Sequence, residues 1–376
     1  MYFAKVESNK MRKPAARSAS CALLVSLASL LPVGGQVVAD LREDLPGDSA
    51  ATSAMQLSEG QLINQAYMPQ HAQEFGSDPS LQIEAFISAI YQDRNGVLWF
   101  GTVGEGVIRY DGDSLRKLSA RDGIGGDEIR GIAEDKNGNM WFATSCGITK
   151  YDGASFTSYT DGNGLASNDV RCITIDSKGI TWVGTLQGVS RFDGKEFTSF
   201  SIPEADPEYA RCEHWWFQGA TSARAVHCII EDSRGDIWFG TNGGAFRYDG
   251  TSLSRISEKE GLCDNSVNRI MESSDGIMWF ATHHNGLCRW DGAAFTQIHA
   301  PQASKDANVW DVYEDKQGSV WFALEGVGVH RFDGKHAREI FKNQSCVSHA
   351  LQCIYEDTEG RMWFGGFLGL FRYDGS

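Results

Sequence analysis

The segment VRCITIDSKGITWVGTLQGVSRFD, from Val170 to Asp193, contains all the elements of a pattern that recurs along the chain. An aliphatic stretch ends in Asp176, a turn with Gly179 follows, and a strand beginning near Trp182 leads to an Arg-aromatic-Asp ending. A tryptophan marks each of seven copies, at positions 99, 141, 182, 238, 279, 321 and 363. The period is about 42 residues, with one longer interval after Trp182. Self-similarity at a fixed period of this length predicts a propeller or a solenoid.

Each copy has the composition of four short strands separated by turns. Gly179 stands where the turn between the first two strands needs a positive φ, and no helical periodicity is present. We therefore predict an all-β fold, a seven-bladed β-propeller with four antiparallel strands in each blade. The seventh copy ends at Ser376 before a fourth strand, so we expect a strand within residues 57–75 to complete the last blade and close the ring. The repeated tryptophans are expected to pack between blades.

The N-terminus has the pattern of an export signal. Four basic residues between Lys10 and Arg17 precede an apolar run from Cys21 to Val33, and small residues end at Ala39. We predict a signal peptide over residues 1–39, a flexible segment over 40–56 and the propeller over 57–376. An uncleaved anchor is the alternative, but the apolar run is short for a membrane span. The expected location is therefore the periplasm or the medium, without membrane insertion after cleavage.

The charge of the chain argues against two classes of partner. The formal net charge is −15, and it becomes −19 when residues 1–39 are removed. Such a surface repels phosphate backbones and anionic headgroups. Nucleic acid is therefore not an expected partner.

One position of the inner strands is polar or aromatic in every repeat. Its occupants are Ser88, Arg130, Arg171, His227, Asn268, Trp310 and Gln352. Arg130, Arg171 and His227 fall in consecutive blades, which favours an anionic ligand at the mouth of the central channel. The alternative is that each arginine pairs with a loop acid such as Asp127 or Asp169.

Aromatic and histidine residues in loops extend this candidate site. The insertion between the third and fourth blades contains Trp215 and Trp216, which could stack on a sugar or only cover the channel mouth. The candidate ligand-binding residues are Arg130, Arg171, His227, Trp215, Trp216, His284 and Trp310. We predict no catalytic residues, no metal and no cofactor. Eight cysteines follow residue 39; Cys172, Cys228 and Cys353 share one position as expected small core residues, and pairing of the others cannot be assigned from sequence.

The repeats resemble a known family. The pattern Val-x-x-Ile-x-x-Asp-x-x-Gly-x-x-Trp-x-Gly-Thr, followed by x-x-Gly-aliphatic-x-Arg-aromatic-Asp, is clear in Val170–Asp193 and Val226–Asp249 and is similar to the two-component regulator propeller repeat. The resemblance implies the extracytoplasmic sensor part of a regulator, without the kinase. It implies a sensing or recognition module. With the candidate residues above, we expect it to bind a small ligand, anionic or carbohydrate, and to have a membrane signalling protein as a partner.

Two other functions stay open. His283, His284 and Glu325 lie in loops of the fifth and sixth blades, and a His/Glu group on a propeller face also resembles the streptogramin lyases. Two adjacent histidines in a tight turn cannot easily bind one metal ion, which weakens this alternative. A scaffold for protein–protein interaction is the other alternative.

Overall fold

The computed structural model describes residues 83, 85–206, 211–212, 219–220, 222–300, 307–341 and 351–373. The chain divides into two units, Met1–Ile63 and Asn64–Ser376, and every described residue lies in the second. In the described ranges the helical elements are two 3-10 turns, η2 (Asp161–Asn163) and η3 (Glu258–Glu260). No helix in this part of the chain is long and apolar enough to cross a membrane.

Seven antiparallel sheets form the blades, and in each of them the strands follow one another in chain order. Six sheets have four strands, and the seventh has three described strands. The blades are β1 (Ile87–Gln92), β2 (Leu98–Thr102), β3 (Val107–Tyr110) and β4 (Leu115–Leu118); β5 (Ile129–Glu134), β6 (Met140–Thr144), β7 (Gly147–Tyr151) and β8 (Phe156–Tyr159); β9 (Val170–Ile175), β10 (Thr181–Thr185), β11 (Gly188–Phe192) and β12 (Phe197–Phe200); β15 (Val226–Glu231), β16 (Ile237–Thr241), β17 (Gly244–Tyr248) and β18 (Leu253–Ile256); β19 (Val267–Glu272), β20 (Met278–Thr282), β21 (Leu287–Trp290) and β22 (Phe295–Ile298); β23 (Val309–Glu314), β24 (Val320–Leu324), β25 (Gly328–Phe332) and β26 (Ala337–Glu339); β27 (Leu351–Glu356), β28 (Met362–Gly366) and β29 (Gly369–Tyr373). The insertion after the third blade adds β13 (Arg211–Cys212) paired with β14 (Gly219–Ala220).

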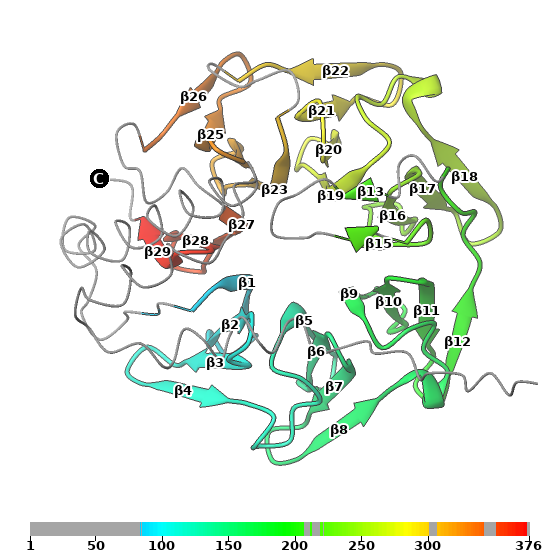
Figure 1. Ribbon diagram of the computed structural model, residues 1–376. Coiled ribbons are helices and arrows are strands. Elements are labelled where there is room, and N and C mark those ends of the chain that lie inside the picture. Colours follow the sequence, from blue (N-terminus) through cyan, green and yellow to red (C-terminus); the bar gives the residue numbers. More distant parts are fainter. Residues whose placement is uncertain are drawn as a thin grey trace, which may run out of the picture. The chain divides into compact units, whose positions relative to one another are not determined.

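The first strands of the blades lie nearest the centre of the ring (Figure 1). Each of them contacts the first strand of the next blade, and β27 contacts β1, so the predicted seven-bladed propeller is confirmed. The contact between blades 7 and 1 includes a hydrogen bond from the Thr358 amide to Gln92 Oε1 (2.8 Å). The Leu370 amide in β29 also donates to the Ile83 carbonyl (3.2 Å). The proposed closing strand within residues 57–75 lies outside the described residues and stays a prediction.

An aspartate directly after the inner strand organises six of the seven blades. In blade 3, Asp176 Oδ1 accepts hydrogen bonds from the amides of Lys178 and Ile180 (3.0 and 2.8 Å), and Oδ2 accepts from Trp182 Nε1 (2.8 Å). Gly179 has φ 84°, which only glycine adopts without strain. The same indole bond is made in all seven blades, although a serine, Ser273, replaces the aspartate in blade 5. One carboxylate therefore fixes both the turn and the repeat tryptophan.

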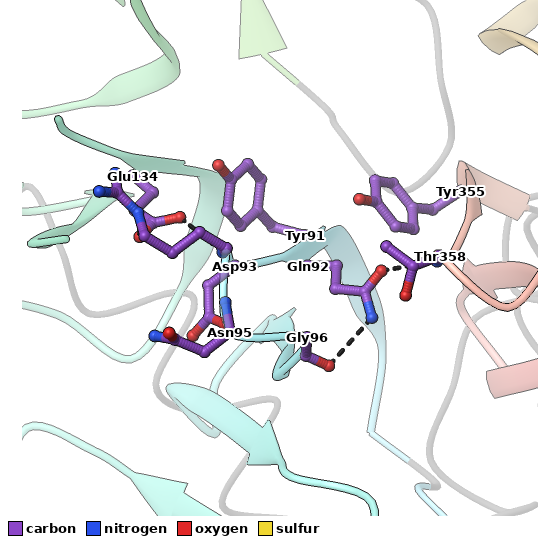
Figure 2. Close-up of a pocket in the computed structure, with 9 residues that line it drawn as sticks. Tyr91, Gln92, Asp93, Asn95, Gly96, Glu134, Tyr355 and Thr358 are labelled. Atoms are coloured by element: carbon purple, nitrogen blue, oxygen red, sulfur yellow. Dashed lines mark hydrogen bonds and ion pairs between the residues drawn. The ribbon is translucent and has the colours of Figure 1, made fainter.

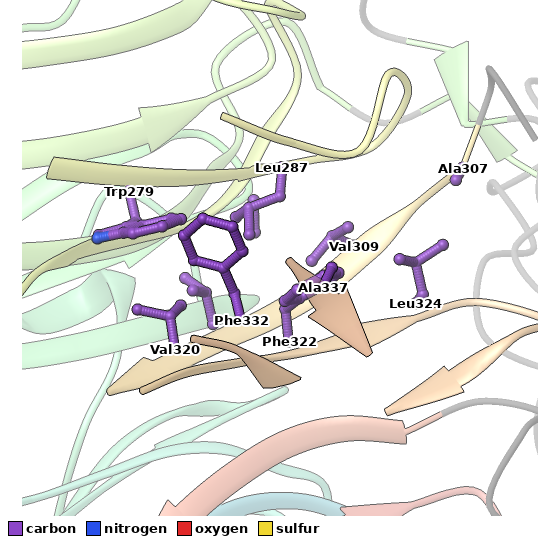
Figure 3. Close-up of a cluster of buried hydrophobic side chains, with 11 residues drawn as sticks. Trp279, Leu287, Ala307, Val309, Val320, Phe322, Leu324, Phe332 and Ala337 are labelled. Carbon is purple, nitrogen blue, oxygen red and sulfur yellow. The ribbon is translucent and has the colours of Figure 1, made fainter. Parts of the chain in front are cut away.

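The hydrophobic core lies between adjacent blades. Figure 3 shows Trp279 and Leu287 of blade 5 against Phe322 and Phe332 of blade 6. The rings of Trp279 and Phe332 are 5.7 Å apart and meet edge to face, a favourable arrangement for aromatic pairs. The expected role of the repeat tryptophans in inter-blade packing is confirmed.

A carboxylate clasp joins neighbouring blades on one face of the ring. Glu272, the last residue of its inner strand, accepts hydrogen bonds from the amide and hydroxyl of Ser233 in the preceding blade (2.5 and 2.7 Å). The same junction is made by four other pairs, Arg94–Glu134, Ser177–Glu231, Ser274–Glu314 and Lys316–Glu356. Between blades 7 and 1 the amide oxygen of Gln92 takes the place of the carboxylate and accepts from the Thr358 amide. Between blades 2 and 3 the acceptor position is Ile175, whose side chain cannot accept a hydrogen bond. Blades 2 and 3 are instead joined by side-chain contacts on the opposite face, where the candidate site lies.

Candidate functional site

Two sets of loops share the face opposite these clasps. In each case a backbone hydrogen bond joins the two loops of one blade. The amide of the first residue after the second strand donates to the carbonyl of the residue just before the inner strand. Examples are Leu186 to Asp169, His283 to Ser266 and Glu325 to Asn308, each at 2.9 Å. This pairing fixes the loops as a rim around the inner strands. The polar face, as we define it, consists of Glu128, Arg130, Asp169, Arg171, His227, Asn242, Asp264, His284 and Trp310.

Arg130 and Arg171 meet at one carboxylate. Asp169 Oδ1 forms an ion pair with Arg130 Nη1 and lies 3.0 Å from Arg171 Nε. Arg130 also binds Glu128 at 2.8 Å and the Val170 carbonyl at 3.3 Å. Because Asp169 and Val170 belong to blade 3, the Arg130 side chain bridges a junction that lacks a carboxylate clasp.

The alternative stated for the two arginines is therefore confirmed for Asp169. It is wrong for Asp127, whose Oδ1 accepts from the Ala120 amide (2.7 Å). Burial and the neighbouring charge of Arg130 lower the pKa of Arg171. Both guanidinium groups thus face acids of the same chain, and the cluster of Arg130, Arg171, Glu128 and Asp169 has no net charge.

His227 lies beside this cluster as a neutral group. Its Nε2 is 2.7 Å from Asn242 Oδ1 in the loop between β16 and β17. Burial, with a smaller effect of the Arg171 charge, lowers the pKa of His227 to about 4. Asn242 also donates to the Ser222 carbonyl (3.1 Å) and accepts from the Ser266 hydroxyl (3.3 Å). The asparagine, which the sequence did not single out, extends the polar network from blade 4 to blade 5.

The second part of the polar face lies in blades 5 and 6. The ring of His283 is 4.7 Å from that of the exposed His284 and 6.1 Å from that of Trp310. Asn285 follows with φ 62°, the one non-glycine residue with positive φ among those the structure describes. Left-handed backbone outside glycine is uncommon and marks a constrained loop. His284 and Trp310, both predicted as ligand-binding residues, are therefore linked through His283.

Asp264 is a site residue that the sequence did not indicate. The residue is 6% exposed; Oδ1 accepts from the Ser266 amide (2.6 Å) and Oδ2 is 3.5 Å from Asn285 Nδ2. Burial is the main cause that raises the pKa of Asp264 to about 6, although the His284 charge lowers it. The equivalent residues in blades 2 and 3 are Gly126 and Ser167. This departure from the repeat is the signal that could have identified it.

A second ion pair lies in the channel. Arg269 Nε is 3.2 Å from Asp311 Oδ1, and Asp311 Oδ2 accepts from the Ile354 amide in blade 7 (2.8 Å). Burial raises the pKa of Asp311. Asp311 thus connects blades 5, 6 and 7, which is a structural role. The predicted small core position is confirmed, since its three cysteines, Cys172, Cys228 and Cys353, are buried.

Glu325, one of the residues behind the lyase alternative, takes part in a hydrogen-bond network between side chains. Glu325 Oε2 accepts from Asn308 Nδ2 (2.7 Å), and Asn308 Oδ1 accepts from Asn268 (2.8 Å). No group of three His, Cys, Asp or Glu side chains that could hold a metal occurs in the described ranges. Trp215 and Trp216 lie outside these ranges, and their predicted role stays a prediction.

An open pocket of about 840 Å³ lies on the clasp side, at the junction of blades 7, 1 and 2. Figure 2 shows the rings of Tyr91 and Tyr355 above Gln92, which bonds both Gly96 and Thr358. Burial raises the pKa of Tyr91 to about 12. The polar groups of this pocket serve the clasps between blades, so we consider the polar face the better candidate site.

The fold is a repeat-built β-propeller, and the polar face lies on the side of the ring opposite the clasps. Six segments match the family model described as two component regulator propeller. They are residues 82–104, 123–146, 164–187, 222–243, 261–284 and 347–367. The repeats of this chain belong to this family, as the resemblance of the sequence implied.

Solved structures of low identity share the fold. The extracellular domain of a protein assigned to the hybrid two-component systems of B. thetaiotaomicron superposes with a TM-score of 0.62 at 23% identity; the match covers 80% of this chain and 40% of that one. A streptogramin B lyase superposes with a TM-score of 0.61 at 15% identity, covering 78% and 95%. PorZ of Porphyromonas gingivalis has a TM-score of 0.60 at 15% identity, covering 77% and 46%. A comparison with curated proteins finds no significant match.

Proposed function

We propose that this chain is an extracytoplasmic recognition propeller of a sensor system and that it binds a small, hydroxyl-rich ligand such as an oligosaccharide on the polar face. The propeller resembles the sensor domains of two-component systems, and several of its structural neighbours are extracellular domains. The chain spans about 40% of the length of those neighbours. A periplasmic or secreted location and a membrane signalling partner are parts of the proposal.

The balance of charge on the polar face carries this choice of ligand. The guanidinium groups of Arg130 and Arg171 face the carboxylates of Glu128 and Asp169. A free anion would have to displace two carboxylates that the chain itself supplies. Hydroxyl groups can instead donate to the carboxylates and accept from the guanidinium groups at the same time. Uncharged or weakly acidic sugars therefore fit the cluster better than small carboxylates do.

The other parts of the polar face suit the same ligand class. Trp310 supplies an aromatic side chain near the rim, and such rings combine an apolar face with a polar edge. His227 is neutral at pH 7 because its pKa is about 4, so it adds no positive charge for an anion. If Trp215 and Trp216 also reach this face, they would add further stacking surface.

Replacing Arg171 with alanine should weaken ligand binding by about 1.5–3 kcal/mol, the range for hydrogen bonds to charged groups. The variant should keep its fold, because Asp169 keeps its ion pair with Arg130, but the lost contact between Arg171 and Asp169 lowers the free energy of unfolding. Titration calorimetry with neutral oligosaccharides, acidic oligosaccharides and small carboxylates checks this on wild type and variant.

Arg191→Ala is the matched control, since Arg191 lies on a third strand and donates to Thr198 (3.3 Å) away from the polar face. Its affinity for the ligand should equal that of wild type. Equal affinity of wild type and Arg171→Ala would remove the arginine cluster from the proposal. Binding of small carboxylates alone, weakened by salt, would favour an anion site. Breakdown of an oligosaccharide during the titration would show an enzyme rather than a binding module.

A further inference from the structure

Two cysteines of blade 5 lie in one hydrophobic cluster next to the loop that carries Asp264. Cys288 lies on β21 and is 1% exposed, and Cys263 lies in the connection from β18 to β19 and is partly buried. Both belong to the cluster that contains Leu262 and Phe280. The Cys263 thiol is also 3.9 Å from the Thr282 hydroxyl.

Equivalent positions in other blades show how close side chains at these two places of the repeat come. The Gly125 amide donates to Thr149 Oγ1 in blade 2, and the Ala166 amide donates to Ser190 Oγ in blade 3, both at 2.8 Å. These pairs correspond to Cys263 and Cys288 in blade 5. A Cβ atom on Gly125 would lie 3.0 Å from Thr149 Oγ1. A disulfide places each Cβ at about this separation, ~3 Å, from the partner sulfur.

We propose that Cys263 and Cys288 form a disulfide bond in the exported protein. In blade 5 cysteines occupy both positions of this recurrent contact, and both side chains belong to one hydrophobic cluster. The Cys263 side chain and burial raise the pKa of Cys288. The bond would tie the loop that carries Asp264 to the strand that follows His284.

The other buried cysteines are arranged differently. Cys172, Cys228 and Cys353 direct their sulfur atoms toward glycines of their own second strands. A Cβ on Gly240 would lie 2.5 Å from the Cys228 sulfur, for example. Cys172 and Cys353 lie 3.8 Å from carbonyl oxygens of the next blade. These thiols fill the space that the glycines leave.

The bond forms by thiol–disulfide exchange with an oxidised disulfide, supplied by an oxidoreductase of the exporting compartment or by glutathione disulfide. The more accessible Cys263 thiolate attacks the oxidant, which forms a mixed disulfide and releases one thiolate. The Cys288 thiolate then attacks Cys263 Sγ and releases the second thiolate. Two protons and two electrons leave the cysteine pair, and the oxidant is reduced to two thiols.

The test uses the purified full chain, incubated with glutathione disulfide and then treated with a thiol-alkylating reagent under denaturing conditions. Trypsin cleavage after Lys259, Arg269 and Arg289 gives the peptides 260–269 and 270–289, each with one cysteine. Mass spectrometry without reduction should find these two peptides linked and lighter by two hydrogen atoms than their sum. Reduction should release them.

Cys288→Ser is the direct variant and Cys228→Ser the matched control, since Cys228 is buried in blade 4. The link should be lost in the first and kept in the second. Alkylation of both cysteines in the wild type, a glutathione adduct that persists on Cys263, or linkage of either peptide to another cysteine would overturn the proposal. The formation of this disulfide in the cell rests on the proposed export. The oxidation of the purified protein does not depend on any ligand, so the disulfide proposal and the proposed ligand binding can fail separately.

Discussion

Replacing Trp238 with alanine should lower the free energy of unfolding by about 3–5 kcal/mol, the range for removing a buried aromatic side chain. Trp238 is 0% exposed, and its ring lies 5.9 Å from the rings of both Phe280 and Trp290 in blade 5. Its Nε1 donates to Asp232 Oδ2 (2.9 Å). The alanine variant loses the packing between two blades and leaves a buried carboxylate without one of its donors. Urea unfolding followed by circular dichroism measures the change.

Two further variants separate these effects. Trp238→Phe keeps an aromatic ring between the blades and loses the indole donor, so it should cost less, about 1–2 kcal/mol. Leu115→Ala, at a residue that is 37% exposed on the outer strand β4, should stay within about 0.5 kcal/mol of wild type. A Trp238→Ala protein as stable as Leu115→Ala would contradict the inter-blade role of the repeat tryptophans.

The propeller could be predicted from the sequence because its main determinants are local. The carboxylate of Asp176 bonds two amides of its own turn and the indole six residues later, so the whole motif lies within seven residues. Arg109 on the third strand of blade 1 likewise pairs with Asp111, two residues later (2.9 Å). The sequence of each repeat therefore determines the structure of its own blade.

The candidate site could be predicted only in part, because its contacts join different blades. Arg130 and its partner Asp169 are 39 residues apart, and both possible partners of the arginines, Asp127 and Asp169, are acids in similar loops. Only the packing of blade 2 against blade 3 decides between them. The burial of Asp264 depends on the conformation of the loop around Asn285. The repeat pattern of the sequence therefore does not predict that Asp264 is buried.

Replacing Asp264 with asparagine should stabilise the protein at pH 7.5 by about 2–3 kcal/mol and leave its stability at pH 4 nearly unchanged. The pKa of Asp264 is about 6 in the folded chain, against 3.8 for an ordinary aspartate. The folded state therefore binds the proton more tightly than the unfolded state does. The neutral carboxyl contributes its full stability below pH 3.8, and this contribution is lost as the pH rises through about 6. Asparagine keeps the acceptor for the Ser266 amide without the buried charge.

Urea unfolding of both proteins at pH 7.5 and pH 4 measures this difference, and effects of other groups such as His227 cancel between them. Asp249→Asn is the control of opposite sign. Asp249 lies exposed in a turn where the amides of Thr251 and Ser252 lower its pKa, so its replacement should not stabilise the protein at pH 7.5. A gain for Asp264→Asn that is equal at both pH values would show that the buried charge is not its cause.

The same substitution should have the opposite effect on the proposed function. A carboxylate that lowers stability at neutral pH, buried beside His284 on the polar face, is expected where the charge serves binding. A ligand hydroxyl that donates to Asp264 would stabilise the ionised form, and asparagine accepts such a bond more weakly. Asp264→Asn should therefore bind the ligand more weakly at pH 7.5 while its fold is more stable. Calorimetry and urea unfolding on the same preparation test both changes, and a variant that is stabilised but binds as well as wild type would place Asp264 outside the binding site.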